Sequence, residues 1–164
     1  DRIEYEIAAF LNGVSAGDIS EATSMKIKAM YKIIGELESL GDSGEAISRM
    51  LSRRNEHKKT FSAETIDNIN LMLEKVDSAY EVMIANLNAA HEGTLSSIAN
   101  AYSAEEQINT LRNELREAEI EALEDNDKNY QTSVYYIDII NELEHMGDYM
   151  INISQSLERA FVEK

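Results

Sequence analysis

The chain contains an internal repeat, and this repeat constrains the fold more than any other feature of the sequence. The stretch 139–154 has an earlier counterpart in 33–48, and the two are identical at nine of sixteen positions when they are offset by 106 residues. Both copies keep the pattern Leu-Glu-x-x-Gly-Asp. A repeat at a fixed offset indicates that one structural unit occurs twice. We therefore expect two related units, each built around one copy of this stretch.

The composition and the spacing of apolar residues predict that both units are helical. Pro is absent and Gly occurs only 7 times, so few residues break helices. Apolar residues recur at helical spacing in five segments, which are separated by stop and cap signals at Asn12-Gly13, Asp18–Glu21, Phe61-Ser62, Gly93-Thr94 and the polar turn Glu124–Asp127. The predicted helices run to about residue 12, from about 20 to 57, from 62 to 90, from 95 to 123 and from 128 to 161.

The lengths of these helices predict an unequal tandem within an all-α fold. Residues 59–164 form three long helices with short connections, which favours an antiparallel three-helix bundle. Residues 1–58 form only two helices, and residues 1–7 resemble 109–115 at an offset of 108. The first bundle is therefore expected to be incomplete, with its opening helix and part of the next one missing. Because the chain starts without Met and inside a helical pattern, we expect it to be a fragment of a longer protein.

The charge of the chain excludes several classes of function. Lys and Arg total 15 and Asp and Glu total 31, which gives a net charge of −16. Such a chain is repelled by nucleic acids and by anionic lipid surfaces, so we expect neither as a direct partner. No apolar stretch approaches the roughly 20 residues that span a bilayer, and no signal peptide is present. Cys is absent, and no nucleophile–base pair or phosphate-binding Gly loop occurs, so we do not expect an enzyme.

Each copy of the repeat carries two acidic residues four positions apart, on one face of its helix. These are Glu38 and Asp42 in the first copy, and Glu144 and Asp148 in the second. Like charges at this spacing destabilise a helix by a few tenths of a kcal/mol, and the mid-helix Gly beside them costs up to about 1 kcal/mol relative to Ala. A bound cation would remove the first cost, and a Gly lets a neighbouring helix or a metal approach closely.

Residues of the fourth predicted helix are the nearest candidates for completing a metal site. Glu105 and Asn109 are again four residues apart, and Asn152 extends the row one turn beyond Asp148. The candidate metal ligands are Glu38, Asp42, Glu105, Asn109, Glu144, Asp148 and Asn152. The alternative interpretation is that the duplicated residues record duplicated packing, with the acidic rows as solvated helix edges. The three His residues are interpreted as surface residues. The pair Tyr135-Tyr136, and Met25 and Met30, are interpreted as core or boundary residues.

The motif that runs from Leu143 to Ile153 resembles the signature helix of the PhoU family of phosphate-regulation proteins. The resemblance implies a tandem of three-helix bundles whose acidic motifs can bind iron or zinc clusters. It implies Glu38, Asp42, Glu144 and Asp148 as the matching acidic positions, Glu105 and Asn109 as the other motif of the second bundle, and Asp1 as a remnant in the first. Asn109 and Ala46 stand where the family pattern has other polar or acidic residues.

The resemblance also implies a function. The chain is most similar to the cytoplasmic PhoU-like domain that follows the membrane part of bacterial sodium/phosphate cotransporters. We therefore expect a regulatory domain that docks on this membrane part and is tethered through it to the inner membrane. One alternative is a stand-alone PhoU-like protein that binds iron or zinc. The other is a helical scaffold or homodimerisation domain without a ligand.

Overall fold

The computed structural model describes residues 2–124 and 129–162, and these residues form an all-α protein. Within these ranges there are five helices and no strand, which confirms the predicted fold class. Their bounds are α1 Arg2–Ser15, α2 Glu21–Glu56, α3 Ala63–Glu92, α4 Ala99–Glu124 and α5 Tyr130–Phe161. In the described part of the chain, no helix is both long and apolar enough to cross a membrane.

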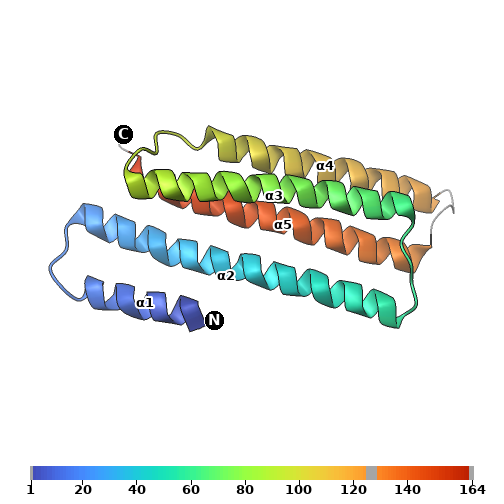
Figure 1. Cartoon of the computed structure of the whole chain (residues 1–164), viewed down its shortest axis with the longest axis horizontal. Helices are drawn as coiled ribbons and strands as arrows, with labels where there is room; N and C mark the ends of the chain where they lie inside the picture. Colours follow the sequence, from blue (N-terminus) through green and yellow to red (C-terminus); the bar gives the residue numbers. More distant parts are fainter. Residues whose placement is uncertain (1, 125–128, 163–164) are drawn as a thin grey trace.

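The four long helices lie side by side, and each runs antiparallel to the one before it (Figure 1). The helices α3, α4 and α5 pack against one another as a three-helix bundle, as predicted for the second unit. The helix α2 packs along α5, and α1 folds back on α2. The two helices that carry the repeat are therefore in direct contact with each other. The division into domains at residues 58 and 59 stays a prediction.

Three helix ends follow the predicted capping signals. Ser20 and Ser62 are the N-caps of α2 and α3, and each side chain accepts a hydrogen bond from the backbone N–H three residues later. Such a cap satisfies one of the free N–H groups at the start of a helix. Gly93 ends α3 with a φ of 72°, in the left-handed region that favours glycine. The second helix ends at Glu56, next to the predicted His57.

Two predicted helix boundaries are wrong, and each has a local reason in the backbone. Helix α1 continues through Asn12-Gly13 to Ser15, because one Gly within a helix costs only about 1 kcal/mol and does not have to end it. Helix α4 begins at Ala99 and not at 95, because the backbone N–H groups of residues 94 and 95 both return to the carbonyl oxygen of Ala89. Residues 125–127 of the predicted polar turn and the predicted helix start at Lys128 lie outside the described residues, as does Asp1.

Helix α5 is the centre of the hydrophobic core. It packs on α3, α4 and α2, and its fully buried apolar side chains are Tyr136, Ile139, Ile140, Leu143 and Ile153. Gly147 permits a close approach of α4, since a Cβ atom placed there would lie 3.0 Å from Cδ1 of Ile108. This confirms the predicted role of the mid-helix Gly in the second unit. The equivalent Gly41 has no atom within 4 Å of such a Cβ, so the prediction is wrong for the first unit.

The first unit leaves apolar residues uncovered that its counterpart buries. Leu37 is 40% exposed, whereas the equivalent Leu143 is fully buried. Met30 is also 40% exposed, whereas the equivalent Tyr136 is 1% exposed. Met25 is 48% exposed, so the interpretation of Met25 and Met30 as core or boundary residues is wrong. The physical reason is that no described helix covers this side of α2 in the way that α3 and α4 cover α5.

Candidate acidic site between α4 and α5

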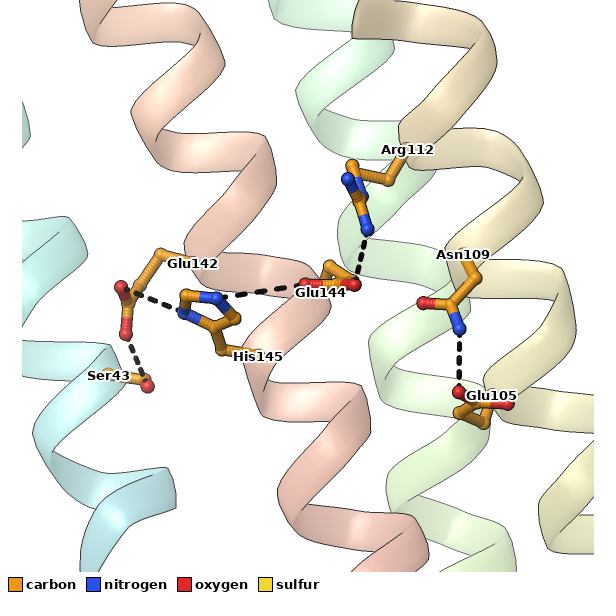
Figure 2. Close-up of polar contacts among 7 residues, drawn as sticks. All are labelled: Ser43, Glu105, Asn109, Arg112, Glu142, Glu144 and His145. Atoms are coloured by element: carbon orange, nitrogen blue, oxygen red, sulfur yellow. Dashed lines mark hydrogen bonds and ion pairs between the residues drawn. The ribbon is translucent and has the colours of Figure 1, made fainter.

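The close approach of α4 and α5 at Gly147 brings two acidic rows to the same face of the bundle. Glu105 and Asn109 lie on α4, and Glu144 and Asp148 lie on α5. Figure 2 shows three of these side chains together with Arg112 of α4, which points toward Glu144. We call these four residues the acidic site, and the pair on each helix an acidic row. They were predicted as ligands, and the structure brings them into one neighbourhood.

Arg112 supplies a positive charge to the acidic row. Its Nη2 atom donates a hydrogen bond to Oε1 of Glu144 at 2.5 Å, and the two side chains are 24% and 11% exposed. A charge-assisted hydrogen bond of this kind is stronger than a neutral one. Sequence reasoning missed Arg112 because it considered only groups that bind cations. The signal was available, since Arg112 follows Glu105 by seven residues and therefore lies on the same helix face.

Asn109 turns its amide toward the neighbouring carboxylate on its own helix. Its Nδ2 atom donates to Oε1 of Glu105 at 2.6 Å. Its Oδ1 atom is buried and has no hydrogen-bond partner among the described residues, and the same holds for Nε of Arg112. A buried polar atom without a partner costs about 1–3 kcal/mol. The α4 side of the acidic site is therefore only partly satisfied.

The environment of Asp148 disfavours its ionised form. Burial raises the pKa of the Asp148 carboxyl above its ordinary value, and the charges of Glu144 and Glu105 raise it further. His145 and Arg112 oppose this effect. Removing a carboxylate from water and placing it near like charges both penalise the charged form. Asp148 is thus the member of the row that an added proton or cation would stabilise most.

A second set of polar contacts joins α5 to α2. Ser43 of α2 is buried and donates to Oε1 of Glu142 at 2.5 Å. His145 lies between the two carboxylates of α5, with Nδ1 3.7 Å from Glu142 and Nε2 3.8 Å from Glu144 (Figure 2). Asn152 donates to Oε2 of Glu36 at 3.2 Å. Asn152 therefore binds α2 and does not extend the acidic row toward α4.

The remaining predicted ligands lie apart from the acidic site. Glu38 of α2 borders a hollow beside Ile3 of α1, and Asp42 is exposed on α2. Across residues 2–124 and 129–162, no three Asp, Glu, His or Cys side chains are grouped so that they could hold a metal ion. As placed, the site does not fit a metal, because Arg112 and Asn109 direct N–H groups at its carboxylates. Metal binding by the seven predicted ligands stays a prediction, and it requires these side chains to rearrange.

The fold and the acidic site define a helical bundle in which carboxylates of neighbouring helices meet on one face. The family model described as the PhoU domain matches residues 69–157, from α3 to the last turns of α5. This match covers more than half of the 164 residues, and the chain belongs to the PhoU family. PhoU is a helical family of regulators, and membership indicates a role in phosphate homeostasis. Neither the curated proteins nor the solved structures include a significant match to the chain.

Proposed function

We propose that this chain is the regulatory and interaction domain of a sodium-dependent phosphate transporter, tethered to the cytoplasmic side of the inner membrane. The PhoU match and the resemblance of the motif 143–153 support a role in phosphate homeostasis, and the link to a transporter is the step that this proposal adds. The observation that carries the proposal is the match of residues 69–157 to the PhoU domain. Arg112 pairs with Glu144, so this carboxylate has a cationic partner within the protein, and control by docking does not depend on a metal there.

The charge of the chain supports a protein partner at the membrane. At −16, the chain is repelled by anionic lipid. The cytoplasmic loops of membrane proteins carry an excess of Lys and Arg, so they attract an acidic domain in the same compartment. Docking of the bundle on such loops would control the transporter through steric and electrostatic contact with its membrane part.

The test is sodium-dependent phosphate uptake by vesicles that contain the membrane part of such a transporter. Uptake is measured with the chain present on the cytoplasmic face, and binding is measured in parallel by co-sedimentation with the vesicles. Protein-free vesicles of the same lipid composition are the control. The proposal predicts binding that needs the transporter and a changed rate of uptake. Binding to both kinds of vesicle, or no change in uptake, contradicts it.

A second candidate function is a PhoU-like phosphate regulator that binds iron or zinc. Two observations favour it: the Oδ1 atom of Asn109 has no hydrogen-bond partner, and the pKa of Asp148 is raised. A cation nearby would give the Oδ1 atom a partner and would stabilise the ionised form of Asp148. Glu105 and Glu144 would complete the set after Arg112 moves away. Near-stoichiometric iron or zinc in protein purified without chelator, lost on the double substitution Glu144→Gln/Asp148→Asn, would favour this candidate. A scaffold or homodimerisation role remains if neither metal nor transporter binds.

A further inference from the structure

Basic residues gather where α2 ends and the connection to α3 begins, at one end of the bundle (Figure 1). Residues 49–59 contain five of the 15 Lys and Arg residues of the chain and a single acidic residue, which gives this segment a net charge of +4 with its His neutral. The whole chain carries −16. We call the last five basic residues of this segment the basic tip: Arg53, Arg54, His57, Lys58 and Lys59. The basic tip shares no residue with the acidic site.

The helix dipole accounts for only part of the basic tip. Cationic side chains in the last turn of a helix are favourable, because the C-terminal end of a helix carries a partial negative charge. Arg53 and Arg54 occupy the last turn of α2. Lys58 and Lys59 follow the C-cap residue His57 and lie outside the helix. The dipole falls off within the last turn, so it does not explain why these two positions are Lys.

The backbone at Lys58 has a conformation that favours Gly. The N–H of Lys58 donates to the carbonyl oxygen of Asn55 at 2.9 Å, and the N–H of Lys59 donates to that of Arg54 at 3.0 Å. This pair of bonds is the Schellman motif, which needs a left-handed residue. Lys58 has a φ of 52° and is the only residue other than Gly with a positive φ in the described part of the chain. At the end of α3, Gly93 takes this conformation. A side chain there strains the backbone, and such strain is typical of functional positions.

Neighbouring side chains hold two members of the basic tip in place. The guanidinium of Arg54 lies over the ring of Phe61, 4.5 Å from its centroid, and Nη2 of Arg54 donates to Oδ1 of Asn55 at 2.6 Å. Nδ1 of His57 forms a hydrogen bond of 2.6 Å with the hydroxyl group of Tyr135 on α5. Groups that are already held lose less conformational entropy when they bind a ligand. The basic tip is therefore better organised for binding than a run of freely solvated charges.

The charge of the rest of the chain selects a compact anion as the ligand. Outside residues 49–59 there are ten Lys and Arg against 30 Asp and Glu, which gives −20. A lipid surface or a nucleic acid would extend along this acidic body and be repelled by it. A compact anion meets the basic tip alone, because charges more than about 8 Å away are largely screened at physiological ionic strength. Lys and Arg bind phosphate oxygens through charge-assisted hydrogen bonds, and the family has a role in phosphate homeostasis.

We propose that the basic tip binds an oligophosphate, a compact anion with several linked phosphate groups. Lys58 and Lys59 contact the phosphate oxygens from the connection, and Arg53 contacts them from the last turn of α2. Several phosphate groups in one anion match several cationic side chains. The proposal goes beyond the proposed function, because it needs neither a transporter nor a metal. It gives the chain a direct contact with a phosphate compound at the point where α2 meets α3.

The experiment measures binding of sodium tripolyphosphate to the full chain by isothermal titration calorimetry at neutral pH and low salt. The test variant is Lys58→Gln/Lys59→Gln. The matched control is Lys28→Gln/Lys32→Gln, which removes the same charge from two exposed Lys residues of α2 outside the basic tip. A third variant, Lys58→Gly, removes one charge and also relieves the backbone strain. Circular dichroism establishes the fold and Tm of each variant. Co-sedimentation with phosphatidylglycerol vesicles tests the lipid headgroup as the source of phosphate.

The proposal predicts that Lys58→Gln/Lys59→Gln binds tripolyphosphate at least about tenfold more weakly than wild type, since a hydrogen bond to a charged group contributes about 1.5–3 kcal/mol. The control pair should change the affinity less than about twofold. Lys58→Gly should raise Tm and weaken binding. Equal weakening in the two Lys pairs would show general charge attraction and would overturn the proposal.

Three other results would also overturn it. The first is no binding of tripolyphosphate to wild type. The second is a raised Tm with unchanged binding in Lys58→Gly, which would leave Lys58 a role in the helix end only. The third is binding to phosphatidylglycerol vesicles without binding to tripolyphosphate, which would assign the basic tip to a lipid surface. Phosphate uptake does not enter any of these measurements, so this proposal and the proposed function can fail independently.

Discussion

Removal of the Arg112 charge tests the electrostatic account of the acidic site most directly. In the variant Arg112→Gln, the carboxylate of Glu144 keeps its burial but loses the partner that lies 2.5 Å away. Breaking a fully buried ion pair costs about 3–5 kcal/mol, and an exposed pair contributes about 0–1 kcal/mol. The side chains here are 24% and 11% exposed, so they lie between these limits. We expect Arg112→Gln to lower the free energy of unfolding by about 2 kcal/mol.

The assay is urea and thermal unfolding followed by circular dichroism at pH 7 and low salt. For a chain of this size, a loss of about 2 kcal/mol lowers Tm by roughly 4–8 °C. The matched control is Arg116→Gln, because Arg116 is an exposed Arg one turn further along α4. Its loss should change the free energy of unfolding by less than about 0.5 kcal/mol. Both variants remove one positive charge, so a difference between them reports the local contact and not the net charge.

The double variant Arg112→Gln/Glu144→Gln separates a buried unpaired charge from a packing defect. Because the second substitution removes the carboxylate, the double variant should be more stable than Arg112→Gln alone, with a coupling of about 1–2 kcal/mol. Equal stability of Arg112→Gln and Arg116→Gln would refute the reasoning. A double variant no more stable than the single one would also refute it, because the cost would then come from lost packing of the Arg stem.

Three further predictions concern the same helices. Burial and neighbouring carboxylates raise the pKa of Asp148, so its ionised form lowers the stability of the folded protein at neutral pH, and this cost disappears as the pH falls. Asp148→Asn should therefore raise the free energy of unfolding in urea by a few tenths of a kcal/mol at pH 7. This gain should shrink toward pH about 4. Gly41→Ala should raise the free energy of unfolding by up to about 1 kcal/mol. Gly147→Ala should give a free energy of unfolding about 1–3 kcal/mol lower than that of Gly41→Ala, because its Cβ would lie 3.0 Å from a buried side chain. Similar Tm values for the two variants would contradict this. Burial raises the pKa of Tyr136 to about 12, so the folded state keeps a proton that the unfolded state releases near pH 10. The free energy of unfolding should therefore fall by up to about 2 kcal/mol between pH about 10 and 12, after allowance for solvent screening. Tyr136→Phe should remove this fall.

The part of the fold that local sequence determines was predictable. The helices of the second unit follow from apolar spacing and from the caps at Ser62 and Gly93, because these signals act within one or two turns. The repeat also predicted a close approach at Gly147, which the contact with Ile108 confirms. The same argument failed at Gly41, because a Gly only permits close approach and a neighbouring helix has to be present. Whether a neighbour is present depends on tertiary structure.

The neighbourhood of Glu105 and Glu144 was predictable from the sequence, and the ion pair within it was not. The rows of α4 and α5 do meet, since helical periodicity places Glu105 and Glu144 on facing surfaces once the helices are paired. The ion pair with Arg112 was missed because a search for metal ligands does not consider the cation that a protein can supply itself. Asn152 was misplaced for a different reason. Its helix has neighbours on several sides, and only the packing of α2 on α5 shows that Glu36 is its partner.

The two copies of the repeated helix place the equivalent residues Glu144 and Glu38 in different surroundings. In α5, the repeat packs against α2, α3 and α4, and Arg112 of α4 pairs with Glu144. In α2, the equivalent Glu38 borders a hollow between α1 and α2. A half-exposed carboxylate there needs no internal cation, since water can hydrate it. The duplicated Glu therefore has an ion-pair partner on a neighbouring helix in one unit, and in the other unit it borders a hollow between α1 and α2.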